Sequence, residues 1–145
     1  MRLRRPTVGD LPTLNRILKE SRAYQGQYAP MLVGYAISAD QLARDHFELA
    51  EDDKGVIGFF SLTPGEPVEL DLMFVADARQ GQGFGGQLFQ AAVGAARGMG
   101  GVRMLIVSNP PAESFYLRQG ARRVGEAPPG GRVTWARPIL HLDLN

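Results

Sequence analysis

A glycine-dense segment in the middle of the chain has the residue types needed to bind a phosphate group. Residues 68–90, VELDLMFVADARQGQGFGGQLFQ, run from an alternating strand pattern into four glycines and then into a helical pattern. Backbone N–H groups lack acceptors at the first turn of a helix, the helix dipole is positive there, and glycine has no Cβ to keep a ligand away. We therefore predict an anion-binding turn.

Two acidic side chains lie on the strand pattern that precedes these glycines. In Val68–Val75 we expect Glu69, Asp71 and Met73 on one face, with the apolar residues at 70, 72 and 74 on the other. Carboxylates are rarely fully buried, so a cleft is indicated. The two acids could supply a general base, bind a substrate ammonium group, or be solvated at the sheet surface.

Periodicity and turn signals predict the elements that position these residues. We expect helices at about 11–24, 39–46, 84–99 and 110–120, and strands at 2–5, 47–51, 56–63, 68–75, 102–108, 121–125 and 133–144. Ser38 and Asn109 are the expected N-caps of the second and fourth helices. The order predicts one mixed α/β domain over residues 1–145, with a sheet built mostly of antiparallel hairpins.

Composition excludes several classes of protein and of site. The 145 residues carry a formal net charge of +1, so no global field indicates a nucleic-acid or membrane partner. The chain has no cysteine, which excludes disulfides, zinc–thiolate sites and a cysteine nucleophile. No apolar run is long enough to span a membrane or to form a signal peptide, so a cytoplasmic protein is expected.

The histidines and the Arg122–Arg123 pair do not indicate a metal site or an RNA-binding site. His46 and His141 lack metal-ligand spacing, so we expect structural roles and no metal. Arg122 and Arg123 are interpreted as solvated rather than as an RNA-binding site.

Several phosphate ligands would suit the glycine turn. Residues 81–86 match GxGxxG, but they lie mid-chain, and no Asp or Glu occupies residues 102–108, where a dinucleotide fold places its ribose ligand. No Lys-Ser/Thr pair follows the glycines, so a Walker loop is disfavoured. A nucleotide-binding regulatory domain, or a turn that only lets a helix pack closely, stays open on these grounds.

Two motifs together resemble the GNAT N-acetyltransferases, which use acetyl-CoA. Their coenzyme motif, Gln/Arg-x-x-Gly-x-Gly/Ala, appears as QGQGFG at residues 80–85, preceded by Arg79. Their second signature appears as Asn109, Tyr116 and Gly120. Ala121 departs from the family, which usually has an aromatic residue there.

The resemblance implies the GNAT fold, with a mostly antiparallel sheet of about six to seven strands flanked by four helices. It implies that N–H groups from Gly81 to Gly86 hold the pyrophosphate of coenzyme A. The pantetheine arm would pair with the end of the preceding strand, and Asn109 and Tyr116 would share a helix face toward it. The expected coenzyme site comprises Met73, Phe74, Val75, Gln80, Gly81, Gln82, Gly83, Phe84, Gly85, Gly86, Asn109 and Tyr116.

The resemblance also implies acetyl transfer to a primary amine, without an acyl-enzyme. Tyr116 corresponds to the family's leaving-group acid, although it could simply pack on the core. Glu69 is preferred as the base, with Asp71 second; Met104 stands where members that acetylate ribosomal N-termini have a Glu. A non-catalytic acyl-CoA-binding module of the same fold is the alternative.

The acceptor amine is not identified by the sequence. The two acids favour a cationic acceptor such as a polyamine, an aminoglycoside or a peptide amine. The aromatic-rich segment 25–35 could pack on the core or line the substrate pocket, and the same two alternatives hold for Trp135. A homodimer is possible, since family members often pair.

Overall fold

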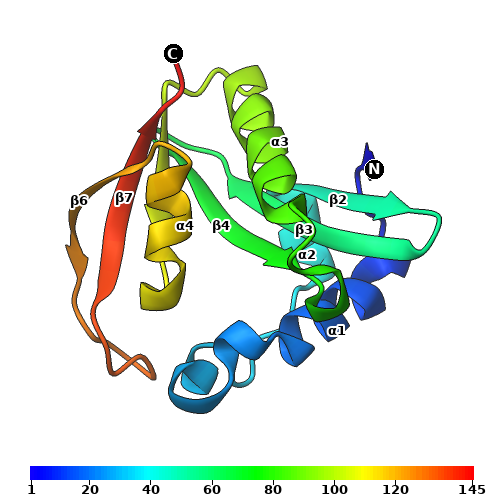
Figure 1. Ribbon diagram of the computed structural model, residues 1–145, viewed down its shortest axis with the longest axis horizontal. Coiled ribbons are helices and arrows are strands. Elements are labelled where there is room, and N and C mark those ends of the chain that lie inside the picture. Colours follow the sequence, from blue (N-terminus) through cyan, green and yellow to red (C-terminus); the bar gives the residue numbers. More distant parts are fainter.

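The fold is built on one seven-stranded sheet with the order β1-β2-β3-β4-β5-β7-β6 (Figure 1). This computed structural model describes residues 1–145. The strands are β1 (Arg2–Arg4), β2 (His46–Asp52), β3 (Gly55–Thr63), β4 (Val68–Val75), β5 (Arg103–Val107), β6 (Arg122–Ala127) and β7 (Arg137–Asp143). Every neighbouring pair is antiparallel except β4 and β5. The mixed, mostly antiparallel sheet predicted from the sequence is confirmed.

Four α-helices and five short 3₁₀ helices complete the fold. The α-helices are α1 (Leu11–Glu20), α2 (Ala39–Arg44), α3 (Phe84–Gly98) and α4 (Glu113–Arg118). The 3₁₀ helices are η1 (Val8–Asp10), η2 (Arg22–Tyr24), η3 (Gly26–Met31), η4 (Asp77–Arg79) and η5 (Pro110–Ala112). None of these helices is both long enough and apolar enough to cross a membrane.

Local signals explain most of the helix boundaries. The Ser38 Oγ accepts a hydrogen bond from the Gln41 backbone N–H at 3.1 Å, which confirms Ser38 as the N-cap of α2. The first helix ends at Glu20 rather than near Tyr24, because Ser21 adopts an extended backbone and a 3₁₀ turn follows. Asn109 occupies the predicted N-cap position, but its side chain caps nothing.

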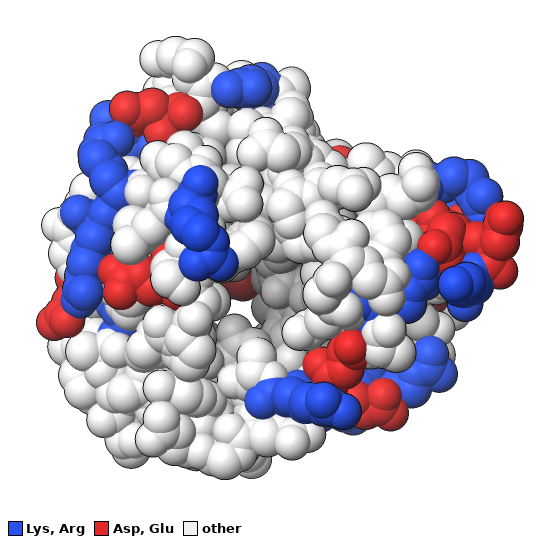
Figure 2. Space-filling view, in the orientation of Figure 1, with Lys and Arg blue, Asp and Glu red and all other residues white.

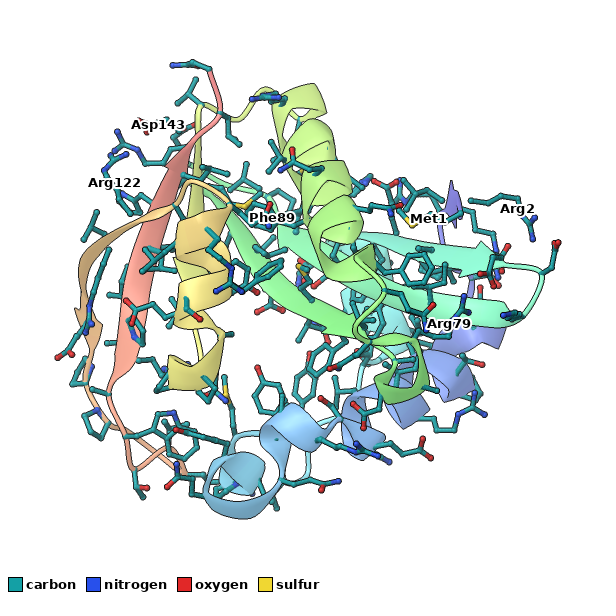
Figure 3. The ribbon with its side chains drawn as sticks, in the orientation of Figure 1. Met1, Arg2, Arg79, Phe89, Arg122 and Asp143 are labelled. Carbon is teal, nitrogen blue, oxygen red and sulfur yellow. The ribbon has the colours of Figure 1, made fainter.

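The sheet separates two apolar clusters. On one face Leu88 and Phe89 of α3 pack against the strands, and partly buried residues of α4 join them. On the other face Leu14 and Leu18 of α1 pack against Phe59. Figure 3 shows Phe89 between α3 and α4. Helices on both faces bury the central strands, as expected of a layered α/β fold.

A β-bulge interrupts the alternation of β4. Leu62 pairs with Leu70 and Ser61 pairs with Leu72, so Asp71 is an extra residue without a partner on β3. Before the bulge residue 70 packs on the α3 side, whereas after it Met73 packs there and residues 72 and 74 pack on the α1 side. The prediction that residues 69, 71 and 73 share one face is therefore wrong, because an extra residue reverses the alternation.

Strands β4 and β5 part soon after they meet. They pair only at Val68 with Met104 and at Glu69 with Leu105. On its other edge β5 pairs with β7 from Arg103 to Val107, whereas residues 70–75 of β4 have no partner on the side that faces β5. We call the space between these diverging strand ends the wedge; in Figure 1, β4 and β7 run apart on either side of α4.

Strand β4 is held on its paired edge by β3, and the two backbones approach closely at Gly58. This close approach can be tested by substitution. A Cβ at this position would lie 2.3 Å from the Phe74 carbonyl oxygen. Gly58→Ala should therefore lower the free energy of unfolding by about 1–3 kcal/mol, as overpacking does. Gly94→Ala is the matched control, since nothing lies within 4 Å of its Cβ position, and it should raise stability by up to about 1 kcal/mol. Urea unfolding measures both, and a Gly58→Ala protein as stable as wild type would contradict the close contact.

Candidate active site

Two adjoining cavities lie in and beside the wedge. The first, of about 320 Å³, borders the glycine turn, and the second, of about 170 Å³, extends between β4 and the end of β5. They share Met73, Val75, Gln80, Ala112 and Tyr116, so they form one continuous site. Figure 2 shows a hollow near the centre of this face, with most charged side chains nearer the margins. The site can take an elongated ligand.

The glycine turn presents a row of free backbone donors. None of the N–H groups of residues 81–86 donates to a protein acceptor, backbone or side chain. Gly81 and Gly83 have φ of +77° and +82°, a conformation that side chains other than glycine rarely adopt, and nothing lies within 4 Å of their Cβ positions. The fifteen-residue helix α3 follows directly, so its positive end points into the same open space.

Packing does not account for all of these glycines. A Cβ on Gly85 would meet the Phe115 ring at an ordinary 3.5 Å, and one on Gly86 would lie 3.7 Å from the Gln119 amide. A turn needed only for close helix packing would leave less room. The open space and the free donors fit an anion, as predicted from the sequence.

Arg79 and Gln80 hold the turn in place. The Arg79 guanidinium donates to both carboxylate oxygens of Asp52, and its Nη1 lies 3.1 Å from Oδ1. This bond lowers the pKa of Asp52 to about 2. The same guanidinium lies 5.2 Å from the centre of the Phe84 ring. Gln80 Nε2 donates to the Val75 carbonyl at 3.2 Å, and Figure 3 shows Arg79 beside the turn.

The structure brings most of the predicted coenzyme residues together. Those that line the two cavities are Met73, Phe74, Val75, Gln80, Gly81, Phe84, Gly85, Asn109 and Tyr116. Gln82, Gly83 and Gly86 line neither cavity, although they belong to the row of free N–H groups. Of the predicted catalytic acids, Asp71 lines the second cavity. Glu69 lines neither and lies at the last paired position of β4 and β5, where the wedge begins.

The acids have raised pKa values. Loss of solvent raises the pKa of Glu69, and the neighbouring Asp71 raises it further, while Arg137 opposes the shift. Loss of solvent and the charge of Asp45 likewise raise the pKa of Asp71. Gln41 Nε2 lies 3.4 Å from the Asp71 carboxylate. These acids share an environment that favours proton uptake or an approaching cation.

Tyr116 and Asn109 reach the second cavity by different routes. Tyr116 projects from α4 and packs against Phe89 at 5.6 Å between ring centres, and burial raises its pKa above the usual value. Asn109 precedes η5 rather than lying on the helix, because Pro110 opens a 3₁₀ turn there. The expectation that two helical turns place both residues on one helix face is wrong, yet both line the same cavity.

Sequence reasoning left several cavity residues unresolved. Tyr24, Met31 and Leu32, from η2, η3 and the residue after it, line the second cavity, so the aromatic-rich segment does border the site. Trp135 was expected on a strand but precedes β7, and its indole Nε1 donates to Asn109 Oδ1 at 3.1 Å. In the sequence, only an irregular segment of mixed aromatic and apolar residues indicated these contacts, and such a pattern is equally typical of a segment that packs on the core.

The remaining candidates lie outside the site. His46 Nε2 is 2.7 Å from Glu48, and no group of His, Cys, Asp and Glu side chains could hold a metal ion. Arg122 pairs with Asp143, as Figure 3 shows, and Arg123 pairs with Glu113 and Glu126. These arginines are therefore engaged by acids of the same chain.

Solved structures with the same fold cover nearly the whole chain. PaiA N-acetyltransferase from Thermoplasma acidophilum, in complex with coenzyme A, is 19% identical with a TM-score of 0.78 over 98% of each chain. The protein yncA from Salmonella typhimurium, with its cofactor acetyl-CoA, is 18% identical (TM-score 0.77) over 100% of this chain and 94% of its own. The ribosomal-protein-S18-alanine N-acetyltransferase from Escherichia coli is 16% identical (TM-score 0.74) over 99% and 93%. At these identities the likeness establishes the fold.

The sequence itself identifies the family. No curated protein sequence matches the chain significantly. The sequence model of the acetyltransferase (GNAT) domain matches residues 43–120, which are more than half of the chain and include β4, the glycine turn, Asn109 and Tyr116. The chain belongs to the GNAT acetyltransferase family.

Proposed function

We propose that residues 1–145 form one domain that transfers an acetyl group from acetyl-CoA to a primary amine. The observation that supports this most strongly is the row of free N–H groups at residues 81–86, beside the unpaired edge of β4. Three residues of this row, Gly81, Phe84 and Gly85, line the first cavity. Six free backbone donors at and just before a helix N-terminus suit a pyrophosphate. Family membership and relatives that contain coenzyme A or acetyl-CoA support the same ligand.

The unpaired edge of β4 suits the pantetheine arm. A strand edge without a partner offers backbone donors and acceptors that an amide-containing chain can pair with. Met73 and Val75 border both cavities, so an arm that leaves the turn along them reaches the part of the second cavity lined by Asn109 and Tyr116. Gln80 already donates to the Val75 carbonyl. The oxygen has a second lone pair, so it can also accept a hydrogen bond from the arm.

The side chains then divide the chemistry of transfer. Bound acetyl-CoA would supply an activated acyl group and a thiolate leaving group. Glu69 would accept a proton from the acceptor amine, and its raised pKa lies closer to neutral pH, where a general base works best. Tyr116 would protonate the leaving group, because its raised pKa keeps the phenol protonated over the neutral range. Without a cysteine, direct transfer is the simplest route.

The acids suggest a cationic acceptor. Glu69 and Asp71 lie where β4 leaves β5, and Asp45 is close enough to raise the pKa of both. Negative charge on this side of the site would attract an ammonium group. Polyamines, aminoglycosides and peptide amines all meet this requirement.

One observation favours a non-catalytic alternative. Glu69 lines neither cavity, so a protein that only binds an acyl-CoA would look the same at the glycine turn. Binding and turnover therefore need separate tests.

Acetyl-CoA should stabilise the protein if the turn is a coenzyme site. At about 100 times its dissociation constant a ligand adds about 2.7 kcal/mol, which corresponds to a rise in Tm of about 10 °C for a chain of this size. NAD and ATP at equal concentration should give much smaller shifts. Thermal unfolding measures all three, and the coenzyme assignment fails if acetyl-CoA leaves Tm unchanged.

Tyr116→Phe and Glu69→Gln should each lower kcat by about 100-fold or more while acetyl-CoA binding persists, because each removes a proton-transfer group. The assay is thiol release from acetyl-CoA with a panel of amines. Glu20→Gln, which removes a carboxylate from the exposed end of α1, is the control and should retain activity. Wild-type turnover in both variants would assign the chemistry to other groups.

The pH dependence should identify Glu69 separately. In wild type, kcat/KM should fall as pH drops through the raised pKa of Glu69, at a higher pH than an ordinary carboxyl of about 4.3 would give. Glu69→Gln should not show this fall in kcat/KM at low pH.

The stability of the protein should respond to pH through the same side chain. Because the pKa of Glu69 is raised in the folded state, its contribution to stability is present below the unfolded-state pKa and is lost as pH rises through the folded-state pKa. Glu69→Gln should therefore be at least as stable as wild type at neutral pH. A lower Tm for Glu69→Gln than for wild type at neutral pH would contradict the conclusion that burial disfavours the charged Glu69 carboxylate.

A further inference from the structure

A hydrogen bond links the two sides of the candidate site. Trp135, in the loop between β6 and β7, donates its indole N–H to the side-chain oxygen of Asn109, which directly follows β5 and Ser108. The two residues are 26 positions apart in the sequence. Asn109 is only 6% exposed, so its side-chain amide has little access to bulk water and depends on hydrogen-bond partners inside the site.

The bond determines which way the Asn109 amide faces. An indole N–H can only donate, so it must meet the amide oxygen, and the amide NH₂ must face elsewhere. That nitrogen, Nδ2, is buried and has no partner in the protein. An asparagine that precedes a helix often caps it with its side chain, but the Asn109 side chain makes no such hydrogen bond. A buried amide nitrogen without a partner is costly, so a ligand acceptor is expected.

The surroundings identify the kind of acceptor. Asn109 lines the second cavity together with Met73, Val75 and Tyr116. An arm lying along the unpaired edge of β4 has amide and thioester carbonyl oxygens, and an NH₂ group can bind them only as a donor. The free Nδ2 therefore suits a carbonyl of the bound arm.

Contacts with η3 and the residues after it hold Trp135 and its loop in place. Its ring packs edge-on against Tyr28 of η3, with 5.0 Å between ring centres. Arg132, in the same loop, donates from its guanidinium to the Val33 carbonyl. In Figure 1 this loop, at the ends of β6 and β7, lies beside the segment that contains η2 and η3. Of these two segments, the one with η2 and η3 lines the second cavity, through Tyr24, Met31 and Leu32.

We propose that Trp135 is a positioning residue that turns the Asn109 amide nitrogen toward a carbonyl of the coenzyme arm. It thereby connects the loop between β6 and β7, and η3 beside it, to the coenzyme site. This inference rests on the proposed binding of acetyl-CoA and assigns to Trp135 a part in it.

Trp135→Phe is the direct test, because it keeps an aromatic ring near Tyr28 and removes the N–H donor together with one ring of the indole. Isothermal titration should show acetyl-CoA binding weakened by roughly tenfold, since the amide can then turn over and present its oxygen. Binding of the nucleotide part of coenzyme A without its pantetheine arm should be unchanged. Equal losses for both ligands would show a general loosening of the fold and would overturn the inference.

A double-mutant cycle separates coupling from packing. Asn109→Ala should weaken acetyl-CoA binding to a similar extent, and adding Trp135→Phe should cause little further loss, because Trp135 acts through Asn109. Fully additive losses would contradict a positioning role.

A variant that keeps the Trp135–Asn109 hydrogen bond tests the inference with less risk of misfolding. Asn109→Asp retains an oxygen for the Trp135 N–H but replaces the free NH₂ with an acceptor, so it should weaken acetyl-CoA binding at least as much as Asn109→Ala. Wild-type affinity in Asn109→Asp, or in Trp135→Phe, would overturn the inference while leaving the proposed function intact. If wild-type protein itself fails to bind acetyl-CoA, the proposed function fails first.

Discussion

The early parting of β4 and β5 is the constraint on which the rest of the site depends. Two strands that continued to pair would satisfy their own backbone groups and leave no space. Here the pairing of β4 with β5 stops at Glu69 and Leu105, while β5 stays paired with β7 on its other edge as far as Val107. The free edge of β4, the cavities beside it and the approach from the glycine turn all follow from that single break in the sheet.

Interactions outside the wedge keep this open arrangement in one geometry. The Arg79–Asp52 pair ties the glycine turn to the β2–β3 hairpin, so the free N–H groups face a defined space. On the opposite side the Trp135–Asn109 bond joins the β6–β7 loop to the end of β5. Rigid support of this kind lowers the conformational entropy that the loops of the protein lose when a ligand binds, which is the physical meaning of preorganisation.

Local patterns in the sequence were sufficient for the order of the elements and for the glycine turn before α3. Glycines at 81 and 83 occupy the positive-φ positions that only glycine adopts readily, and α3 begins where the apolar period changes. The cap at Ser38 is equally local. Each of these depends on a few consecutive residues, so spacing and residue type are enough to predict it.

Features that involve distant segments lay beyond such patterns. The bulge at Asp71 arises from the register with β3 and reverses the faces of the residues around it, which strict alternation along one strand does not reveal. Asn109 and Trp135, 26 residues apart, meet because β7 returns beside β5. Residue types and spacing thus established the glycine turn and the succession of strands and helices. Strand pairing between remote segments established which side chains face the site, because those contacts exist only once the sheet has formed.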